Sequence, residues 1–494
     1  MGKKIPLWQV LIVLLFAILC FTHGSGVLGR AFGDAFACSY GELHIPLVVA
    51  AVFAAIVAAL NGWKWSFIEN GIVACINRAM AALLILMTVG ILMGAWIAAG
   101  VVPAMIYYGL AILKPSIFLI AACLLCFICA MATGSSWTTV GTIGVALVGI
   151  GTALGLNIAM CGGAMVAGAY AGDKMSPMSD TTNLSPAMAG TDLFTHIKHM
   201  MWTVTPSFII ALIVYGIMGF MSSGGEADMS MAAELQASIK ECFDINLALL
   251  IPPCIVIAMV IFKIPALPGL FGGIAVAMVL GSIFQGIHLG DWYGYLHYGF
   301  AFADPDAVDP FLVDLLTRGG LDGMMWTISM GFAALAFGGI MEATGMLETL
   351  VDVMSRLAKG AKGLMLTTIV TTILTLMICC DQYMALLLPG AMFREKFEDM
   401  RLAPENLSRI LEDAGTVVSP IIPWTTCAMT MSSFMGIPAI SYAPYAILCW
   451  VNPFVSAFYA ITGISVNKLS DEEYERILAN REKTRQEALE ALKA

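Results

Sequence analysis

The chain has 494 residues, of which 60% are hydrophobic and only 12% are charged. A soluble domain usually carries about 25% charged residues, so this composition argues against a soluble protein, which would need many buried helices with almost no polar face. The net charge of −10 lies mainly in loops and indicates no particular substrate.

Long apolar segments follow one another along the chain, and several approach the roughly 20 residues that a helix needs to cross the hydrocarbon core of a membrane. The clearest are 5–22, 45–60, 79–99, 117–132, 206–221, 245–262 and 267–287. No clean small-residue cleavage site closes the first segment, so an uncleaved first helix is expected instead of a signal peptide. The stretches 63–78 and 291–322 are amphipathic and are expected along the membrane interface. The sequence therefore predicts an all-α polytopic membrane protein.

The distribution of Lys and Arg predicts the orientation. Lys3 and Lys4 precede the first apolar segment, and the tail from Lys468 holds six Lys and Arg residues. By the positive-inside rule both termini are expected in the cytoplasm, which requires an even number of crossings of the cell membrane. Ser470 is expected to cap a charged helix in the tail, because acidic residues follow it at once.

The first polar break lies in the first half, at Gly134-Ser-Ser-Trp-Thr-Thr139. A glycine followed by serine lets a helix end and the backbone reverse without steric cost. Such a turn exposes carbonyls and hydroxyls, here those of Ser135, Ser136 and Thr138, to a shared cavity. Na⁺ needs about five or six oxygen ligands of this kind, as other hard cations do. The alternative is a continuous helix whose hydroxyls bond to their own backbone.

A second polar stretch opens at Asp173. Pro177 removes a backbone donor and disfavours helix at the residue before it, and Pro186 follows nine residues later. Four consecutive residues between the prolines, Asp180, Thr181, Thr182 and Asn183, supply one carboxylate, two hydroxyls and an amide. We therefore predict an unwound segment within the membrane. The alternative, an ordinary polar loop outside the membrane, leaves a matching Ser-Pro element in the second half unexplained.

An isolated acid, Asp381, interrupts an apolar stretch of the second half. Acids at membrane depth are costly and usually face a transport pathway, although an acid near a helix end can reach the interface instead. A single carboxylate holds either a proton or Na⁺ but rarely both, and this competition suffices for exchange. The segments Ser419-Pro420 and Pro423-Trp-Thr-Thr426 then repeat the chemistry of the unwound segment, and Glu412 is a second-rank candidate.

Spacing suggests an internal repeat. Gly100 ends an apolar run 76 residues before Ser176-Pro177, and Gly345 ends another 74 residues before Ser419-Pro420. The polar break at Ser135 lies 35 residues after Gly100, and Asp381 lies 36 residues after Gly345. Since the segment between the halves is poor in Lys and Arg, it is expected outside, which gives the halves opposite orientations. The expected organisation is a first inverted repeat at 1–221, a polar loop at 222–244, a second inverted repeat at 245–467 and a charged, helical cytoplasmic tail at 468–494.

These patterns define one candidate site at the middle of the membrane. The residues expected to bind the ion or substrate are Ser135, Ser136, Thr138, Asp180, Thr181, Thr182, Asn183, Asp381, Thr425 and Thr426. The expected ligands of Na⁺ itself are Ser135, Asp180, Thr182, Asp381 and Thr425. The candidates for proton coupling are Asp180, Asp381, Asp413 and Asp173.

Three long motifs carry a resemblance to a known family. They are Gly134-Ser-Ser-Trp-Thr-Thr-Val-Gly-Thr142, the stretch from Gly168 to Leu184 continued by Ala189-Gly-Thr-Asp-Leu-Phe-Thr-His196, and Ile410-Leu-Glu-Asp-Ala-Gly-Thr416 with Ser419-Pro-Ile-Ile-Pro-Trp-Thr-Thr426. The chain resembles the NhaC family of Na⁺/H⁺ antiporters over nearly its whole length. The resemblance implies two inverted repeats with re-entrant hairpins, and Na⁺ and H⁺ as coupled ions. The chain departs from the family pattern at Thr425, where Asn is expected.

We therefore predict a secondary active Na⁺/H⁺ antiporter that works by alternating access. The alternative is a Na⁺- or H⁺-coupled exchanger of a small carboxylate or amino acid, since the family includes malate/lactate-type exchangers. A channel or a membrane enzyme is a third class. The scattered histidines disfavour an enzyme, and the lack of a phosphate-binding loop argues against ATP as the driving force of transport. No cofactor is expected. The expected partners are membrane lipid and a small ion or solute, with no nucleic acid and with a homodimer as a candidate assembly.

Overall fold

The computed structural model of the chain describes residues 3–24, 42–222, 229–262 and 264–479, together with positions 28, 29, 33, 38 and 481. Within these residues every regular element is a helix, and strand-like pairing is limited to one isolated bridge between Leu402 and Lys468. The prediction of an all-α protein is confirmed.

The first half contains α1 (Leu7–Gly24), α3 (His44–Leu60), α4 (Trp65–Ala98), α5 (Val101–Ile112), α6 (Pro115–Thr133), α7 (Ser136–Ala153), α8 (Ile158–Met175), α9 (Asp180–Ala189) and α10 (Leu193–Ser222). The connecting region contains α11 (Met229–Cys242), η2 (Leu247–Leu250), α12 (Ile251–Ile261), α13 (Ala266–Phe284), α14 (Trp292–Tyr298), η3 (Pro305–Ala307) and α15 (Pro310–Leu316). The second half contains α16 (Gly320–Ala343), α17 (Met346–Leu357), α18 (Gly360–Cys379), α19 (Gln382–Asp399), α20 (Pro404–Leu411), η4 (Glu412–Thr416), η5 (Ser419–Ile421), α21 (Thr426–Met435), α22 (Ala439–Tyr442), η6 (Ala443–Tyr445) and α23 (Ile447–Thr462).

Many of these helices suit a membrane. Among the described residues, eight helices are long and apolar enough to cross it, or up to ten if each of two bent helix pairs is one span. Large apolar side chains also face outward on them: on α10, Ile213 is 58% exposed and Phe220 is 76% exposed. Such faces are stable in hydrocarbon and unfavourable in water. The prediction of a polytopic membrane protein is confirmed.

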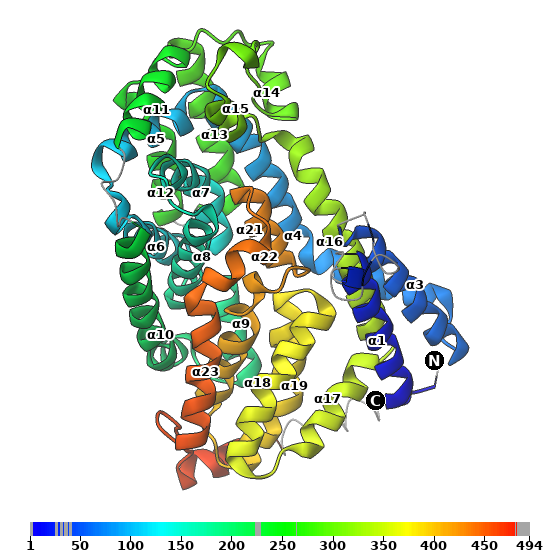
Figure 1. Cartoon of the computed structure of the whole chain (residues 1–494). Coiled ribbons are helices and arrows are strands. Elements are labelled where there is room, and N and C mark those ends of the chain that lie inside the picture. Colours follow the sequence, from blue (N-terminus) through cyan, green and yellow to red (C-terminus); the bar gives the residue numbers. More distant parts are fainter. Residues whose placement is uncertain are drawn as a thin grey trace.

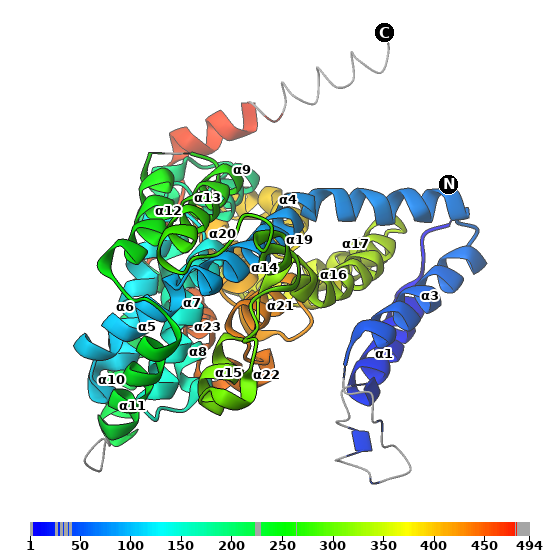
Figure 2. The same ribbon diagram turned by 90° about the horizontal axis from the view of Figure 1, so that it is seen from above.

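The helices form one large body with a smaller pair at its side. In Figures 1 and 2, α1 and α3 lie beside the body, and the long helix α4 reaches from the body over to them. Helix α16 packs along both α4 and α3 and joins the two parts. The stretch 63–78, expected as a separate interfacial segment, is instead mostly the first part of the continuous 34-residue helix α4. The stretch 291–322 forms the short elements α14, η3 and α15 and the start of α16.

The same series of helix caps occurs twice. In each half a helix ends at a left-handed residue, and the next begins at a side chain that accepts a hydrogen bond from the backbone N–H three positions on. The left-handed pairs are Gly100 and Gly345, Gly134 and Cys380, and Gly190 and Gly436; the capping pairs are Ser135 and Asp381, and Ser179 and Thr425. The members of the first pair lie 245 positions apart, and those of the others 246. On this register Pro177 corresponds to Pro423, since each lies two residues before a capping residue, and not to Pro420 as the Ser-Pro spacing suggested.

Both described ends of the chain lie at the same face. Lys4 Nζ lies 2.8 Å from Asp352 of α17, and Arg481 Nη1 lies 2.9 Å from Asp399 at the end of α19. These two helix ends are neighbours, because Lys396 of α19 donates to the Ser355 carbonyl of α17 at 3.1 Å. An even number of crossings is consistent with this arrangement.

Two segments that connect or follow the halves contain helical residues. The segment 222–244, expected as a loop, contains helix α11, and residues 223–228 lie outside the described part. The tail helix is present over residues 471–479, where Ser470 Oγ accepts from the Glu473 N–H at 3.3 Å and the Glu473 carboxylate accepts from the Ser470 N–H at 2.9 Å. This reciprocal pair is a capping box, so the predicted Ser470 cap is confirmed. Residues 480 and 482–494 lie outside the described part of the chain.

Two glycines bring α6 and α8 into backbone contact. A Cβ at Gly168 would lie 2.0 Å from the Cys123 carbonyl oxygen, and one at Gly172 would lie 2.1 Å from that of Phe127. Small residues four apart allow this kind of close approach between membrane helices. Since α8 leads directly to the polar stretch that begins at Asp173, this contact fixes the base of the candidate site.

We expect Gly168→Ala to destabilise the protein by about 1–3 kcal/mol or more, because the new methyl group must push two backbones apart. The measurement is thermal unfolding of the purified protein in detergent. Gly323→Ala is the control: Gly323 lies in α16 with no atom within 4 Å of an added Cβ, so the variant should unfold no earlier than the original. Equal unfolding temperatures for the Gly168 variant and the control would contradict the close approach.

Candidate functional site

The first polar break is a true helix break. Helix α6 ends at Thr133, Gly134 takes the left-handed conformation with φ 68°, and Ser135 caps α7 by accepting from the Thr138 N–H at 3.1 Å. The alternative of a continuous helix is therefore wrong. The matching break in the second half ends α18 at Cys379, places Cys380 at φ 58° and caps α19 with Asp381.

The second polar stretch is unwound only over Ser176–Ser179. Contrary to the prediction, Asp180 to Asn183 lie in the first turn of α9, because the Ser179 hydroxyl accepts from the Thr182 N–H and starts the helix there. The break is not a solvated loop either, since Ser176 and Ser179 are buried. Pro186 lies inside α9 without ending it.

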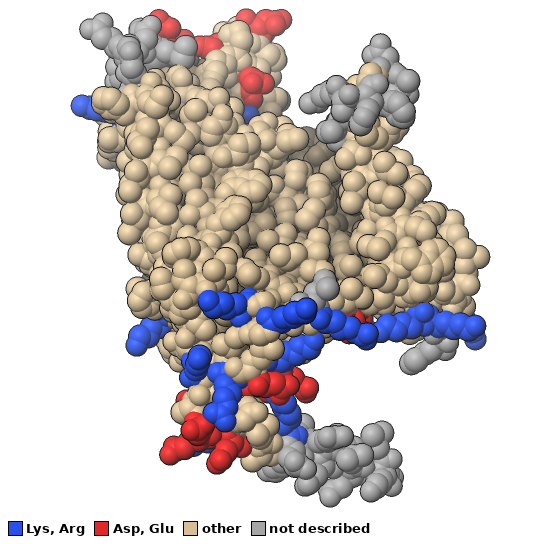
Figure 3. Space-filling view, turned by 60° about the horizontal axis from the view of Figure 1, so that its bottom comes forward, with Lys and Arg blue, Asp and Glu red and all other residues tan. Residues whose placement is uncertain are grey.

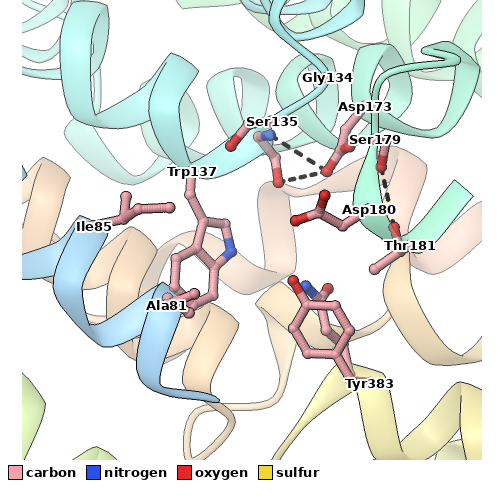
Figure 4. A pocket seen from close by; sticks show the side chains of 13 residues that line it. Ala81, Ile85, Gly134, Ser135, Trp137, Asp173, Ser179, Asp180, Thr181 and Tyr383 are labelled. Carbon is pink, nitrogen blue, oxygen red and sulfur yellow. Dashed lines mark hydrogen bonds between the residues drawn. The ribbon is translucent and has the colours of Figure 1, made fainter. Parts of the chain in front are cut away.

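A small polar cavity of about 80 Å³ lies where these breaks meet (Figure 4). Its polar lining comes from α7, α8, α9 and α19, and α4 adds an apolar wall. The lining residues are Ala81, Ala82, Ile85, Gly134, Ser135, Ser136, Trp137, Asp173, Ser179, Asp180, Thr181, Gln382 and Tyr383. The structure thus brings together five of the residues predicted from the sequence: Ser135, Ser136, Asp173, Asp180 and Thr181.

The two carboxylates of the cavity differ in their surroundings. Asp173 is 7% exposed, and its Oδ2 accepts from the Ser136 hydroxyl at 2.8 Å and the Ser136 N–H at 3.3 Å. Its Oδ1 is buried and has no hydrogen-bond partner among the residues that the structure describes. Asp180 is exposed and faces Tyr383 across the cavity (Figure 4). The cavity therefore offers one solvated carboxylate and one buried oxygen that is free to contact a cation.

A buried ion pair stands behind this cavity. Lys174 Nζ lies 3.1 Å from Glu412 Oε2, and both side chains are fully buried. The ammonium also donates to the Thr181 hydroxyl at 2.5 Å and lies 3.8 Å from Asp173 Oδ2. Glu412 opens the π-helical turn η4 and accepts from the hydroxyls of Ser185 and Thr416. A π-helical turn inside a longer helix is frequent at functional sites.

A smaller cavity adjoins the first and contains the acid of the second half. Asp381 and Thr426 line it, and Asp381 is only 5% exposed. Asp381 Oδ2 accepts from the Met384 N–H at 3.1 Å. Trp137 and Tyr383 line both cavities, and they are matching residues of the two halves, 246 positions apart. Asp381 thus lies in a second cavity that shares the lining residues Trp137 and Tyr383 with the first.

Four other residues that were predicted as ligands line neither cavity. The Thr182 hydroxyl is buried and donates to the Asp173 carbonyl at 3.3 Å, and Thr138 is buried without lining either cavity. The Asn183 amide donates to the carbonyls of Pro177 and Ser179, which stabilises the turn before α9. The Thr425 hydroxyl caps α21 and donates to the Ser419 carbonyl at 2.6 Å. These bonds are those of residues that shape the backbone of the site.

Asp413 belongs to a separate buried cluster. Its Oδ1 accepts from Thr203 at 2.9 Å and Asn452 at 2.6 Å, and its Oδ2 lies 3.8 Å from the guanidinium of Arg409. Arg409 in turn contacts His199 at 3.0 Å. His199 and His196, which lies three residues earlier in α10, are buried against α20.

Sequence reasoning missed the lining residues Trp137, Ser179, Gln382 and Tyr383, and also Lys174 behind the cavity. Lys174 is a lone cation next to Asp173 in an otherwise uncharged stretch, which is a usable signal. Trp137 and Tyr383 each lie two residues after a capping residue, so a correct register between the halves would have paired them.

The bundle of apolar helices contains broken helices, buried carboxylates and a small polar cavity. This combination is typical of secondary transporters. A family model described as "Na+/H+ antiporter family" matches residues 168–464. The chain belongs to this Na⁺/H⁺ antiporter family, and the resemblance inferred from its motifs is confirmed.

Relatives match over most of both chains. The Na⁺/H⁺ antiporter NhaC of Alkalihalophilus pseudofirmus is 36% identical over 441 residues, which cover 89% of this chain and 93% of the relative. The malate-2H⁺/Na⁺-lactate antiporter of Bacillus subtilis is 33% identical over 421 residues, covering 85% and 89%. The arginine/ornithine antiporter ArcD of Halobacterium salinarum is 33% identical over 435 residues, covering 87% and 89%. All three are antiporters, but they differ in what they exchange.

Proposed function

We propose that this protein exchanges Na⁺ for H⁺ across the cell membrane by alternating access. The observation that carries the proposal is the cavity lined by Asp173 and Asp180 together with the hydroxyls of Ser135, Ser136 and Thr181. These oxygens are the ligands that hard cations prefer, and a carboxylate among them can take a proton in the absence of the cation. The names of two relatives with NhaC-type activity support the same exchange.

The charge of the cavity bears on the alternative substrates. Its ionisable lining groups are Asp173, Asp180 and Tyr383, and the nearest ammonium, that of Lys174, is held by Glu412. This lining favours a cation over malate or lactate, which are anions. A cationic amino acid remains the second candidate, since the acidic lining suits it as well and one relative is an arginine/ornithine antiporter.

The two halves act in this proposal as inverted repeats, with the domain limits predicted from the sequence and the breaks at Ser135 and Asp381 as the turns of re-entrant hairpins. The repeated caps support the repeat, and so does the crosswise packing in which α9 lies on α19 while α21 lies on α7. Lys and Arg side chains gather along one side of the face in Figure 3, which supports a cytoplasmic location for that side and for both termini.

A panel of ions and solutes tests the exchange. Purified protein in proteoliposomes is exposed in turn to gradients of Na⁺, Li⁺, K⁺, malate, lactate, arginine and ornithine, while an internal dye records pH and a solid-supported membrane records current. We expect Na⁺ to drive proton movement and the carboxylates to drive none. Proton movement driven by arginine or ornithine but not by Na⁺ would replace the proposal with the second candidate.

We expect Asp381→Asn to lower Na⁺-driven proton movement at least about tenfold while the protein still folds. Asn caps a helix as well as Asp does, so the bond to the Met384 N–H survives, but the amide cannot bind or release a proton. The matched control is Asp192→Asn, which changes an exposed capping residue at the start of α10 and should transport normally. Full transport by a folded Asp381→Asn variant would remove Asp381 from the coupling mechanism.

A further inference from the structure

Lys174 is the charged side chain nearest to the cavity that does not itself line it. Its ammonium lies behind two lining residues, donating to Thr181 at 2.5 Å and standing 3.8 Å from Asp173 Oδ2. Glu412, which does not line the cavity either, holds the ammonium at 3.1 Å. Since the side chain is fully buried, its charge acts on the cavity with little screening by water.

The lining oxygens alone do not explain a preference for Na⁺. Two carboxylates with hydroxyls and carbonyls are also the ligands that Ca²⁺ and Mg²⁺ take in proteins. Asp173 Oδ1 is buried, unpartnered and adjacent to the cavity, so it is available to any cation that enters. A group other than the ligands must therefore discriminate between one positive charge and two.

We infer that Lys174 is a specificity-determining residue whose fixed ammonium makes the cavity prefer a monovalent cation over a divalent one. Repulsion between the ammonium and a bound cation is proportional to the cation's charge, so it costs a divalent ion twice as much as Na⁺. Glu412 balances the charge of the ammonium but does not line the cavity, so the ammonium is the end of the ion pair that faces the lining residues Asp173 and Thr181. This inference rests on the proposed function, because it assumes that the cavity binds the transported cation.

The two ends of the ion pair should act in opposite directions on cation binding. In Lys174→Met the repulsion is lost, so Ca²⁺ and Mg²⁺ should bind more tightly relative to Na⁺. In Glu412→Gln the ammonium keeps its charge but loses its main partner, so it should turn to Asp173 and weaken Na⁺ binding. A residue that only supports the fold would weaken binding of every cation in both variants.

The experiment measures inhibition of Na⁺-driven proton movement by Ca²⁺ and Mg²⁺ in proteoliposomes, together with calorimetric binding of each ion to the purified protein. The principal variant is Lys174→Met/Glu412→Gln, which removes both charges and so leaves neither one buried alone. We expect its preference for Na⁺ over Ca²⁺ to fall severalfold, because the ammonium that is removed lies closer to the lining than the carboxylate that balances it. Lys198→Met, which removes an exposed lysine from α10, should leave the preference unchanged.

The outcomes distinguish a failure of the proposed role of Lys174 from a failure of the proposed function. An unchanged preference for Na⁺ over Ca²⁺ in the folded double variant, with exchange intact in the original protein, overturns the role of Lys174 alone. A lack of Na⁺-driven proton movement in the original protein overturns the proposed function. Weaker binding of all cations in the double variant, with their ratios unchanged, assigns the pair a structural role and also overturns the inference.

Discussion

Replacing Asp180 with Asn should abolish the pH dependence of Na⁺ binding at the cavity and reduce exchange at least about tenfold. Asp180 is the solvated carboxylate of the lining and faces Tyr383 across the cavity (Figure 4), so it is the acid that an arriving ion or proton meets first. The neutral amide keeps one oxygen ligand but cannot exchange a proton. Apparent Na⁺ affinity should therefore be weaker in the variant and nearly constant with pH, whereas in the original protein it should fall as the pH is lowered.

The measurement is the Na⁺ concentration that gives half-maximal proton movement, taken at a series of pH values. Asp322→Asn is the control, because Asp322 is likewise an exposed acid in the first turn of a helix, α16, but lies outside the cavity. Asp180→Glu keeps the charge on a longer arm and should shift selectivity among Li⁺, Na⁺ and K⁺ while preserving the pH dependence. An Asp180→Asn variant with unchanged affinity and pH profile would make Asp180 a structural residue and pass its role to Asp173 or Asp381.

Breaking the buried ion pair from one side should have the largest effect on stability. In Glu412→Gln the Lys174 ammonium stays fully buried without its main counter-charge, and removing one partner of such a pair typically costs about 3–5 kcal/mol. The double variant Lys174→Met/Glu412→Gln removes both charges and should recover most of that loss. The gain is possible because replacing a whole buried pair by neutral groups is often neutral or stabilising.

Thermal unfolding in detergent compares the three proteins. The expected order of unfolding temperature places the original and the double variant close together and Glu412→Gln well below them. Glu234→Gln, the same change at an exposed position of α11, should unfold with the original protein. A double variant less stable than Glu412→Gln would mean that the side chains contribute through packing and not through their charges.

The fold class was predictable because its signals are local. The lengths of apolar segments such as 117–132 and 206–221 can be read directly from the sequence. The helix break at Gly134-Ser135 follows from two adjacent residues, because Gly134 can take a positive φ and Ser135 can cap a helix. The helical state of Asp180 to Asn183 was missed although its cause is also local. Two prolines in this stretch predict an unwound segment, but the hydroxyl of Ser179 between them caps α9 and starts the helix.

Other features of the site depend on contacts that no local pattern contains. Lys174 and Glu412 are 238 positions apart in the chain, so nothing near either residue shows that they pair. Asp413 has the sequence context of a membrane acid, yet its partners Thr203 and Asn452 come from α10 and α23 and place it in a separate cluster. The spacing of the Ser-Pro elements is misleading, because the caps of α9 and α21 align Pro177 with Pro423 in the register of the two halves.

Competition between Na⁺ and a proton for one carboxylate of this cavity is measured by Na⁺ binding to the purified protein as a function of pH. Calorimetric titration at half-unit steps gives the apparent dissociation constant in the absence of any gradient. If one proton competes with one Na⁺, this constant should rise about tenfold for each pH unit below the pKa of the carboxylate and level off above it. A dissociation constant that stays the same across the pH range would show that Na⁺ and a proton do not compete for a carboxylate of this cavity.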